Sequence, residues 1–306
     1  MKQITIADGK ITTGNIAAGC MRIENMTDKE ADAFIGTCID SGITLFDHAD
    51  IYGDGASEAV FGKALHRNKS LRSKIVLQTK CGIVPGVMFD FSEGHILKAV
   101  DGSLKRLGVD SVDIFLLHRP DTLVEPEEVQ SAFTKLYNSG KVKHFGVSNQ
   151  NPSQMRFLQK NISFELKINQ LQFSAAHTGM IDRGLLVNTG FGGAIDKDGG
   201  VLDYCREHNI TIQAWSPFQC GFFDGVFIGA EKYKELNAVL TELAAKHNST
   251  PTGIATAFIL RHPANFQVIT GTTKPNRIRE ICAASELTLS REEWYKIYIS
   301  AGNPLI

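Results

Sequence analysis

Four polar residues of different chemistry follow one another early in the chain: Asp47, Tyr52, Lys80 and His118. They offer an acid, a phenol, an amine and an imidazole. A phenol with a tuned pKa can donate a proton to a carbonyl oxygen, which is general acid catalysis. An unperturbed tyrosine has a pKa of about 10, and a neighbouring ammonium lowers it. We therefore expect Lys80 to lower the pKa of Tyr52.

The remaining two groups complete this chemistry. Asp47 is expected to keep the lysine charged and fixed, and His118 to hydrogen-bond the substrate oxygen. Reduction of a carbonyl also requires a hydride, which no side chain supplies, so the set implies a bound cofactor.

Each of these residues lies at or just beyond the end of a short apolar run. Ile43–Phe46 precedes Asp47, Ile75–Leu77 leads towards Lys80, and Val112–Leu117 precedes His118. Short apolar runs bounded by turn signals are typical of buried parallel strands. The carboxyl ends of such strands form the active-site face of barrel enzymes, where the four groups can converge.

The same alternation of strand and helix continues to the end of the chain. A hairpin is predicted around Asp8-Gly9, and Thr27 with Glu30 forms a capping box for the first helix. Ser57 is predicted to cap the second helix. We expect strands at Asn15–Gly19, Ile43–Phe46, Lys74–Thr79, Val112–Leu117, Lys143–Val147, Lys167–Leu171, Ile210–Trp215 and Phe266–Ile269.

Eight strand-then-helix units predict an α/β fold, a single (β/α)8 TIM barrel with an N-terminal β-hairpin and extra helices. Residues 1–306 show no linker-like stretch, so one domain is the simplest interpretation. Periodicity alone leaves open a sheet built from two halves. Two long glycine-rich segments, Ser174–Gly200 and Phe218–Gly229, are expected to be loops that shape the substrate pocket.

Composition excludes several other classes of protein. The 306 residues carry a formal net charge of −1 without a dense basic run, so we expect no nucleic-acid or membrane partner. The six cysteines include no C-x-x-C pair, which favours a cytoplasmic protein with free thiols. The first ten residues lack the apolar core of a signal peptide.

At the four polar residues the sequence resembles the aldo-keto reductase superfamily, and the resemblance covers nearly the whole chain. The matching segments are G-I-T-L-F-D-H-A-D-I-Y-G from Gly42, L-Q-T-K-C-G ending at Gly82, D-I-F-L-L-H-R-P-D from Asp113, G-K-V-K-H-F-G-V-S-N from Gly140, A-W-S-P-F from Ala214 and G-T-T-K-P-N-R-I from Gly271.

The resemblance implies an eight-stranded barrel that reduces aldehydes and ketones with NADPH. It makes Tyr52 the general acid, lets His118 orient a small-molecule carbonyl substrate, and gives Lys80 and Asp47 the tuning role. The residues that it assigns to NADPH/NADP+ binding are Gly19, Met21, Arg22, Ser148, Asn149, Gln170, Trp215, Ser216, Pro217, Gly271, Thr272, Thr273, Lys274, Arg277 and Glu280.

The segment after the last strand also supports an anion site on physical grounds. A helix is predicted to begin near Pro275, and backbone N–H groups at a helix start favour anions. Lys274 and Arg277 add positive charge, and arginine can bind a phosphate with two parallel hydrogen bonds. By resemblance this is the site of the adenosine 2′-phosphate, so NADPH is favoured over NADH. Ile281 replaces an asparagine that many family members have there.

Two other functions remain open. A metal-dependent hydrolase on the same barrel could use Asp47, His48, Asp50 and His118 as ligands, although further histidines at other strand ends are missing. On a strand, His48 should point away from the face of Asp47, so we interpret it as a packing residue. A cofactor-binding regulatory subunit of the same family is the third possibility, made less favoured because no long extension precedes the barrel. We expect a monomer or weak dimer.

Overall fold

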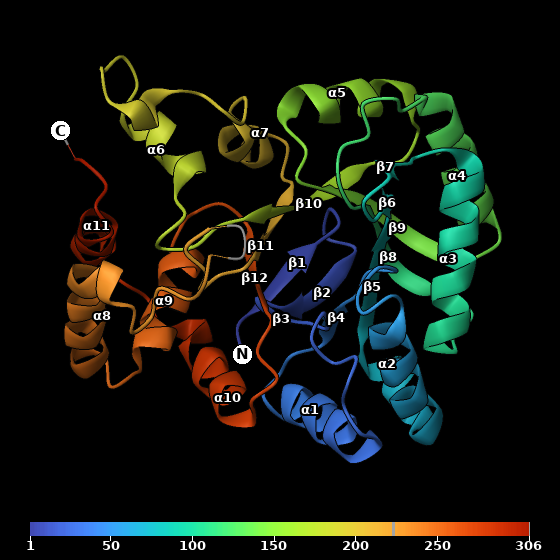
Figure 1. Ribbon diagram of the computed structural model, residues 1–306, viewed down its shortest axis with the longest axis horizontal. Coiled ribbons are helices and arrows are strands. Elements are labelled where there is room, and N and C mark those ends of the chain that lie inside the picture. Colours follow the sequence, from blue (N-terminus) through green and yellow to red (C-terminus); the bar gives the residue numbers. More distant parts are fainter. Residues whose placement is uncertain (222–223, 306) are drawn as a thin grey trace.

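The computed structural model describes residues 1–221 and 224–305, and eight parallel strands form a closed barrel at its centre (Figure 1). Around the barrel the order is β10, β11, β12, β3, β4, β5, β8, β9, which confirms the predicted architecture. The strands are β3 (Ile16–Gly19), β4 (Leu45–Asp47), β5 (Val76–Cys81), β8 (Val112–Leu117), β9 (Val142–Ser148), β10 (Leu166–Gln172), β11 (Thr211–Trp215) and β12 (Phe266–Thr270).

Helices surround the barrel and cover its outer face (Figure 1). Most of them connect one strand to the next, as in the βαβ unit. They are α1 (Asp28–Asp40), α2 (Ala56–Arg67), α3 (Glu93–Leu107), α4 (Pro126–Asn138), α5 (Pro152–Asn161), α6 (Gly179–Leu185), α7 (Val201–Glu207), α8 (Lys234–Lys246), α9 (Pro251–Leu260), α10 (Pro275–Ala283) and α11 (Arg291–Ser300).

The predicted hairpin closes the amino-terminal end of the barrel. Strands β1 (Gln3–Ile6) and β2 (Ile11–Gly14) pair antiparallel and lie across the middle of the ring of helices in Figure 1. The side-chain amide of Asn265, next to the start of β12, donates to the carbonyl of Thr5 at 2.9 Å. Ile6 packs into an aliphatic cluster inside the barrel with Leu45 and Ile168. The opposite end of the barrel is left for the site.

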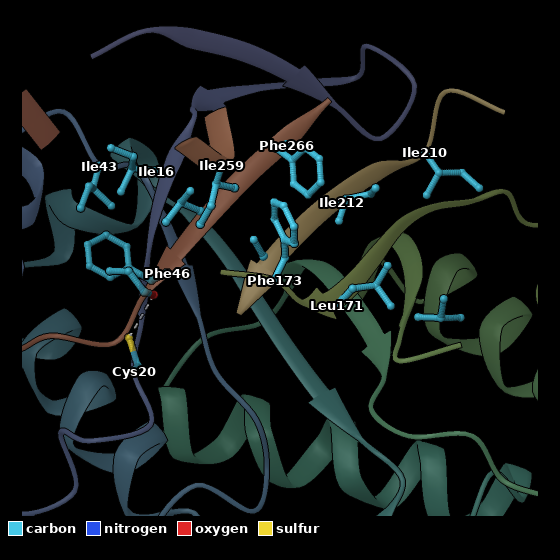
Figure 2. Close-up of a cluster of buried hydrophobic side chains, with 14 of the residues drawn as sticks. Ile16, Cys20, Ile43, Phe46, Leu171, Phe173, Ile210, Ile212, Ile259 and Phe266 are labelled. Atoms are coloured by element: carbon cyan, nitrogen blue, oxygen red, sulfur yellow. Dashed lines mark hydrogen bonds between the residues drawn. The ribbon is translucent and has the colours of Figure 1, made fainter. Parts of the chain in front are cut away.

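A larger core fills the space between the strands and the helices. Figure 2 shows part of it, including Phe173, Ile212 and Phe266. The rings of Phe173 and Phe266 stack with centroids 5.2 Å apart. Ile259 of α9 belongs to the same cluster, so burial of apolar surface fixes this helix against the strands.

Local signals located most helix ends. The capping box of Thr27 and Glu30 starts α1, and Ser92 caps α3 by accepting from His95 N–H. The predicted Ser57 cap is wrong, because Gly55 at φ +84° is the N-cap of α2. Ser57 instead donates its hydroxyl to the carbonyl of Met21 at 3.4 Å.

The sequence interpretation missed short elements in segments that contain glycine. A small hairpin, β6 (Ile83–Val84) with β7 (Met88–Phe89), follows β5. Helix α6 lies within the predicted loop Ser174–Gly200, where Tyr298 of α11 donates to the Asp182 carboxylate at 2.9 Å. Elements this short have too little periodicity to be recognised from sequence.

The cysteines and the helices also bear on the class of protein. The cysteines are free thiols among the described residues, as predicted. In the same part of the chain, no helix has the length and apolar character needed to cross a membrane.

Candidate active site

A cavity of about 820 Å³ opens at the carboxyl ends of the strands. Its size is typical of small-molecule and cofactor sites. Of the four residues singled out first, Asp47, Tyr52 and His118 line it. The predicted cofactor residues in its wall are Gly19, Met21, Arg22, Ser148, Asn149, Gln170, Trp215, Ser216, Pro217, Gly271, Thr272, Thr273, Lys274 and Arg277.

Lys80 and Asp47 form a buried ion pair beneath this cavity. The Lys80 ammonium donates to both carboxylate oxygens of Asp47, at 2.7 and 2.8 Å, and to the carbonyl of His48 at 2.7 Å. Lys80 is fully buried and Asp47 is 2% exposed. The ammonium thus has three acceptors. Burial lowers the pKa of Lys80, but attraction to Asp47 and Tyr52 raises it by more, so the net shift is upward.

Tyr52 is held above this pair by a tight turn between β4 and α2. Tyr52 N–H donates to the carbonyl of Ala49 at 3.1 Å, and Gly53 follows at φ +57°. A side chain at Gly53 would meet Glu24, so the turn requires glycine. The Lys80 ammonium lies 5.0 Å from the centroid of the Tyr52 ring.

The electrostatic expectation for Tyr52 needs a correction. Burial raises the pKa of this phenol, Lys80 lowers it and Asp47 raises it again, with a net result above the ordinary value. Lys80 thus acts in the predicted direction, but desolvation of the phenol is the larger effect. The structure favours the protonated form of Tyr52, which is the form that an acid needs.

His118 lines the same cavity as Tyr52. The two rings are 6.1 Å apart at their centroids and nearly perpendicular. Burial lowers the pKa of His118 well below its ordinary value, and the charges of Lys80 and Arg119 lower it further. The imidazole is therefore neutral, and its buried Nδ1 has no hydrogen-bond partner among the described residues.

The four ligands considered for a metal-dependent hydrolase do not converge. His48 is fully buried, and its ring packs edge-on against Phe61 with the ring centroids 4.6 Å apart. It lies on the outer side of the barrel, as its position on the strand predicted. Burial lowers the pKa of His48 to about 3. Asp50 instead lies with Cys81 and His95, with their ligand atoms within 4.8 Å of one another. The described residues thus offer no metal site built from Asp47, His48, Asp50 and His118.

A second group of polar side chains lies where β9, β10 and β11 end. Asn149 adopts the left-handed conformation at φ +57°, which asparagine tolerates better than most residues. Its side-chain oxygen accepts from the Trp215 indole N–H at 3.1 Å, and its amide donates to the Ser148 hydroxyl at 2.7 Å. Gln170 contributes to the same wall. The three polar residues and the indole form one surface.

The far end of the cavity is formed by the start of α10. Gly271 to Thr273 precede the helix, and Lys274 is its N-cap with extended backbone. The Lys274 N–H donates to the Thr272 hydroxyl at 3.3 Å. Arg277 lies in the first turn and lines the cavity, whereas Glu280 is one turn further along and is not among the lining residues.

Some lining residues were not singled out from the sequence. They include Glu24, Ile51, Gly53, Ile83, Arg119, Phe218, Gln219, Val226, Ile228, Thr252 and Ile269. The guanidinium carbon of Arg119 lies 5.6 Å from the centroid of the Trp215 ring. The sequence could have indicated Arg119 as a site residue, because it directly follows His118 at the end of β8.

The two long loops differ in their contribution. The described part of Phe218–Gly229 supplies four lining residues, and Phe222 and Phe223 lie outside the described residues. Among the residues that the structure describes, none from Ser174–Gly200 lines the cavity, contrary to expectation. Asp182 of that segment accepts a hydrogen bond from Tyr298 of α11, and Ser174 donates to the carbonyl of the lining residue Gln219 at 2.8 Å.

The chain is similar to known proteins along nearly its whole length. Residues 15–300 match the model of the aldo/keto reductase family. The chain belongs to this family. A 6-dehydroglucose reductase of Agrobacterium fabrum is 34% identical, with 98% of each chain covered, and the oxidoreductase YdhF of Escherichia coli is 33% identical, with 97% of this chain and 96% of the relative covered.

Solved aldo-keto reductases share the fold of this family member. One from Klebsiella pneumoniae, in complex with NADPH, superposes with a TM-score of 0.79 at 24% identity, covering 99% of this chain and 97% of the other. The chain is thus an oxidoreductase of the aldo/keto reductase family, built on a (β/α)8 barrel.

Proposed function

We propose that this aldo-keto reductase reduces aldehydes or ketones to alcohols with NADPH, using Tyr52 as general acid. The observation that carries the proposal is the contact of the Tyr52 phenol with the buried Lys80–Asp47 pair at the floor of the cavity. A protonated phenol beside a fixed ammonium is a proton donor whose phenolate product is stabilised at once.

His118 has the complementary role in this proposal. Its neutral imidazole can donate a hydrogen bond to the carbonyl oxygen of the substrate. That bond orients the oxygen towards the Tyr52 hydroxyl on the neighbouring wall. The two groups then bind the substrate oxygen from two sides, and the proton passes from Tyr52 to it.

The donor set around the cavity fits a nicotinamide dinucleotide phosphate, whose nicotinamide supplies the hydride when bound. The hydroxyl of Ser148, the amide of Asn149 and the side-chain oxygen of Gln170 suit the carboxamide, and Trp215 suits stacking on the ring. The start of α10, with Lys274 and Arg277, suits the 2′-phosphate. The NADPH complex of the structural neighbour supports the same choice of cofactor.

Arg277→Ala is expected to weaken NADPH binding by roughly tenfold or more, because a charge-assisted hydrogen bond contributes about 1.5–3 kcal/mol. Binding of NADH, which lacks the 2′-phosphate, should change little. Fluorescence titration of both nucleotides measures the effect. Arg279→Ala is a matched control, since Arg279 is exposed on the same helix and contacts Asn276. Equal losses for NADPH and NADH would refute the assignment of the 2′-phosphate.

The substrate is proposed from the chemistry of the cavity wall. Glu24 and Arg119 place an acceptor and donors of hydrogen bonds in a cavity that also contains apolar groups. This favours a polar, hydroxylated aldehyde over a purely apolar one. The name of the relative from Agrobacterium fabrum, 6-dehydroglucose reductase, supports the same class.

Oxidation of NADPH with a panel of carbonyl compounds tests the function. The panel should contain hydroxylated aldehydes such as 6-dehydroglucose, matched aldehydes without hydroxyl groups, ketones and quinones. We expect turnover with aldehydes, and the highest kcat/KM with hydroxylated ones. No oxidation of NADPH with any member would refute the proposed function.

A further inference from the structure

The barrel contains a layer of buried glutamines next to the Lys80–Asp47 pair, which lies beneath the proposed proton donor. Gln78, Gln213 and Gln267 are fully buried, and Gln170 is 3% exposed. The interior of such barrels is ordinarily filled with branched aliphatic side chains. Burying an amide is costly unless its hydrogen bonds are made, so four together require an explanation.

The strand register explains how the layer forms. Gln78 is paired with Asp47 between β4 and β5, and Gln213 is paired with both Gln170 and Gln267 between β10, β11 and β12. Successive residues of a strand alternate between its two faces. Leu45, two residues before Asp47, therefore lies on the same face, in the aliphatic cluster closer to the hairpin.

The amides converge on one carboxylate oxygen. Gln78 Nε2 donates to Asp47 Oδ1 at 2.6 Å, and Gln170 Nε2 donates to the same atom at 3.2 Å. Lys80 donates to this oxygen as well, at 2.7 Å. Asp47 Oδ1 thus accepts three hydrogen bonds, two of which come from neutral amides.

The rest of the layer fixes the orientation of Gln78. Its amide also donates to Gln213 Oε1 at 2.8 Å, and its oxygen accepts from Gln213 Nε2 at 2.9 Å. Gln213 in turn donates to Gln267 at 2.9 Å, and Gln267 donates to the carbonyl of Gly14 at 2.7 Å. Each amide therefore has one assignment of its nitrogen and oxygen, anchored at the hairpin end.

From this network we infer that Gln78 is a positioning residue for proton transfer, acting on Tyr52 through Asp47 and Lys80. The inference rests on the proposed function. The Gln78 amide disperses the negative charge of Asp47 and holds the carboxylate in place. Without it, Asp47 would bind the Lys80 ammonium more tightly and oppose ionisation of Tyr52 more strongly. The phenol would become a weaker acid.

The test compares Gln78→Met with Gln267→Met. Both variants replace a buried glutamine by an unbranched side chain of similar length, and both remove partners of Gln213, but only Gln78 contacts Asp47. A merely structural role predicts the same outcome for both. Thermal unfolding and NADPH binding first establish that each variant is folded with an intact cavity.

For Gln78→Met we expect kcat to fall about tenfold, equivalent to roughly 1.4 kcal/mol in the barrier, with NADPH affinity unchanged. The isotope effect with NADPH deuterated at the transferred position should increase, and the alkaline limb of the kcat/KM profile should move to higher pH. Gln267→Met, which can act on Asp47 only indirectly through Gln213 and Gln78, should change both quantities by much less than Gln78→Met does. A readout that needs no turnover is titration of Tyr52 by ¹³C NMR, which should show a higher midpoint in Gln78→Met.

Identical isotope effects and pH profiles in the two variants would overturn the inference. If Gln78→Met does not fold, Gln78→Glu replaces it, because a protonated glutamic acid at this position has the same shape and can still donate to Asp47. As pH rises, ionisation of the new carboxyl should abolish activity at a lower pH than the one at which the wild type loses activity. An unchanged pH profile of activity would contradict the inference. A wild-type protein that reduces no carbonyl would refute the proposed function itself.

Discussion

Tyr52→Phe should lower kcat by roughly 10²–10⁴-fold while NADPH affinity stays unchanged, because proton donation by a positioned side chain contributes about that much. Phenylalanine keeps the ring that packs near His118 and loses only the hydroxyl that interacts with Lys80. Steady-state rates and a fluorescence titration with NADPH measure the two quantities on the same preparation.

The control is Tyr137→Phe, the same substitution at an exposed position of α4. Its turnover should equal that of the wild type. Turnover of Tyr52→Phe at the wild-type rate would remove Tyr52 as the acid.

Burial keeps the pKa of His118 well below its ordinary value. The pH profile of wild-type activity should therefore show no titration of His118 near neutral pH. Activity should fall as pH rises through the raised pKa of Tyr52.

Lys80→Met is expected to destabilise the protein by about 3–5 kcal/mol and to abolish turnover. Removing one partner of a buried ion pair leaves the other charge uncompensated, and such losses are large. Here the carboxylate of Asp47, 2% exposed, would keep only its amide donors. Denaturant unfolding measures the free energy, with the slope of the transition compared between variants.

Two further variants show whether the pair itself is responsible. Lys141→Met removes an exposed pair with Asp101 and should change stability by less than about 1 kcal/mol. The double variant Asp47→Asn with Lys80→Met removes both charges and should recover part of the stability lost in Lys80→Met. A double variant less stable than Lys80→Met would contradict the idea that the unpaired carboxylate causes the loss.

The sequence was sufficient to predict the barrel and much of its site. Strand ends could be located because apolar runs end at polar residues, as Val112–Leu117 does before His118, and parallel strands bring such ends together. Most of the predicted cofactor residues line the cavity for the same reason. Their roles in binding remain predictions.

What the sequence did not reveal depends on contacts between distant residues. Gln78 and Gln213 lie 135 positions apart, and a single buried glutamine in a strand carries no signal of its partner. The pKa of Tyr52 likewise depends on how many atoms surround the phenol, which only the folded chain determines. The Ser57 cap failed because the preceding glycines allow a left-handed backbone that starts α2 earlier.

The hydrogen bonds between the buried glutamines also join strands on opposite sides of the barrel. Gln78 belongs to an early strand, whereas Gln170, Gln213 and Gln267 belong to the last three. A chain cut between β9 and β10 would leave Asp47 in one fragment and three of the amides in the other. Neither half should then be stable alone, and mixing the two should restore the barrel. The same polar contacts that surround Asp47 therefore couple the two halves into one cooperative folding unit.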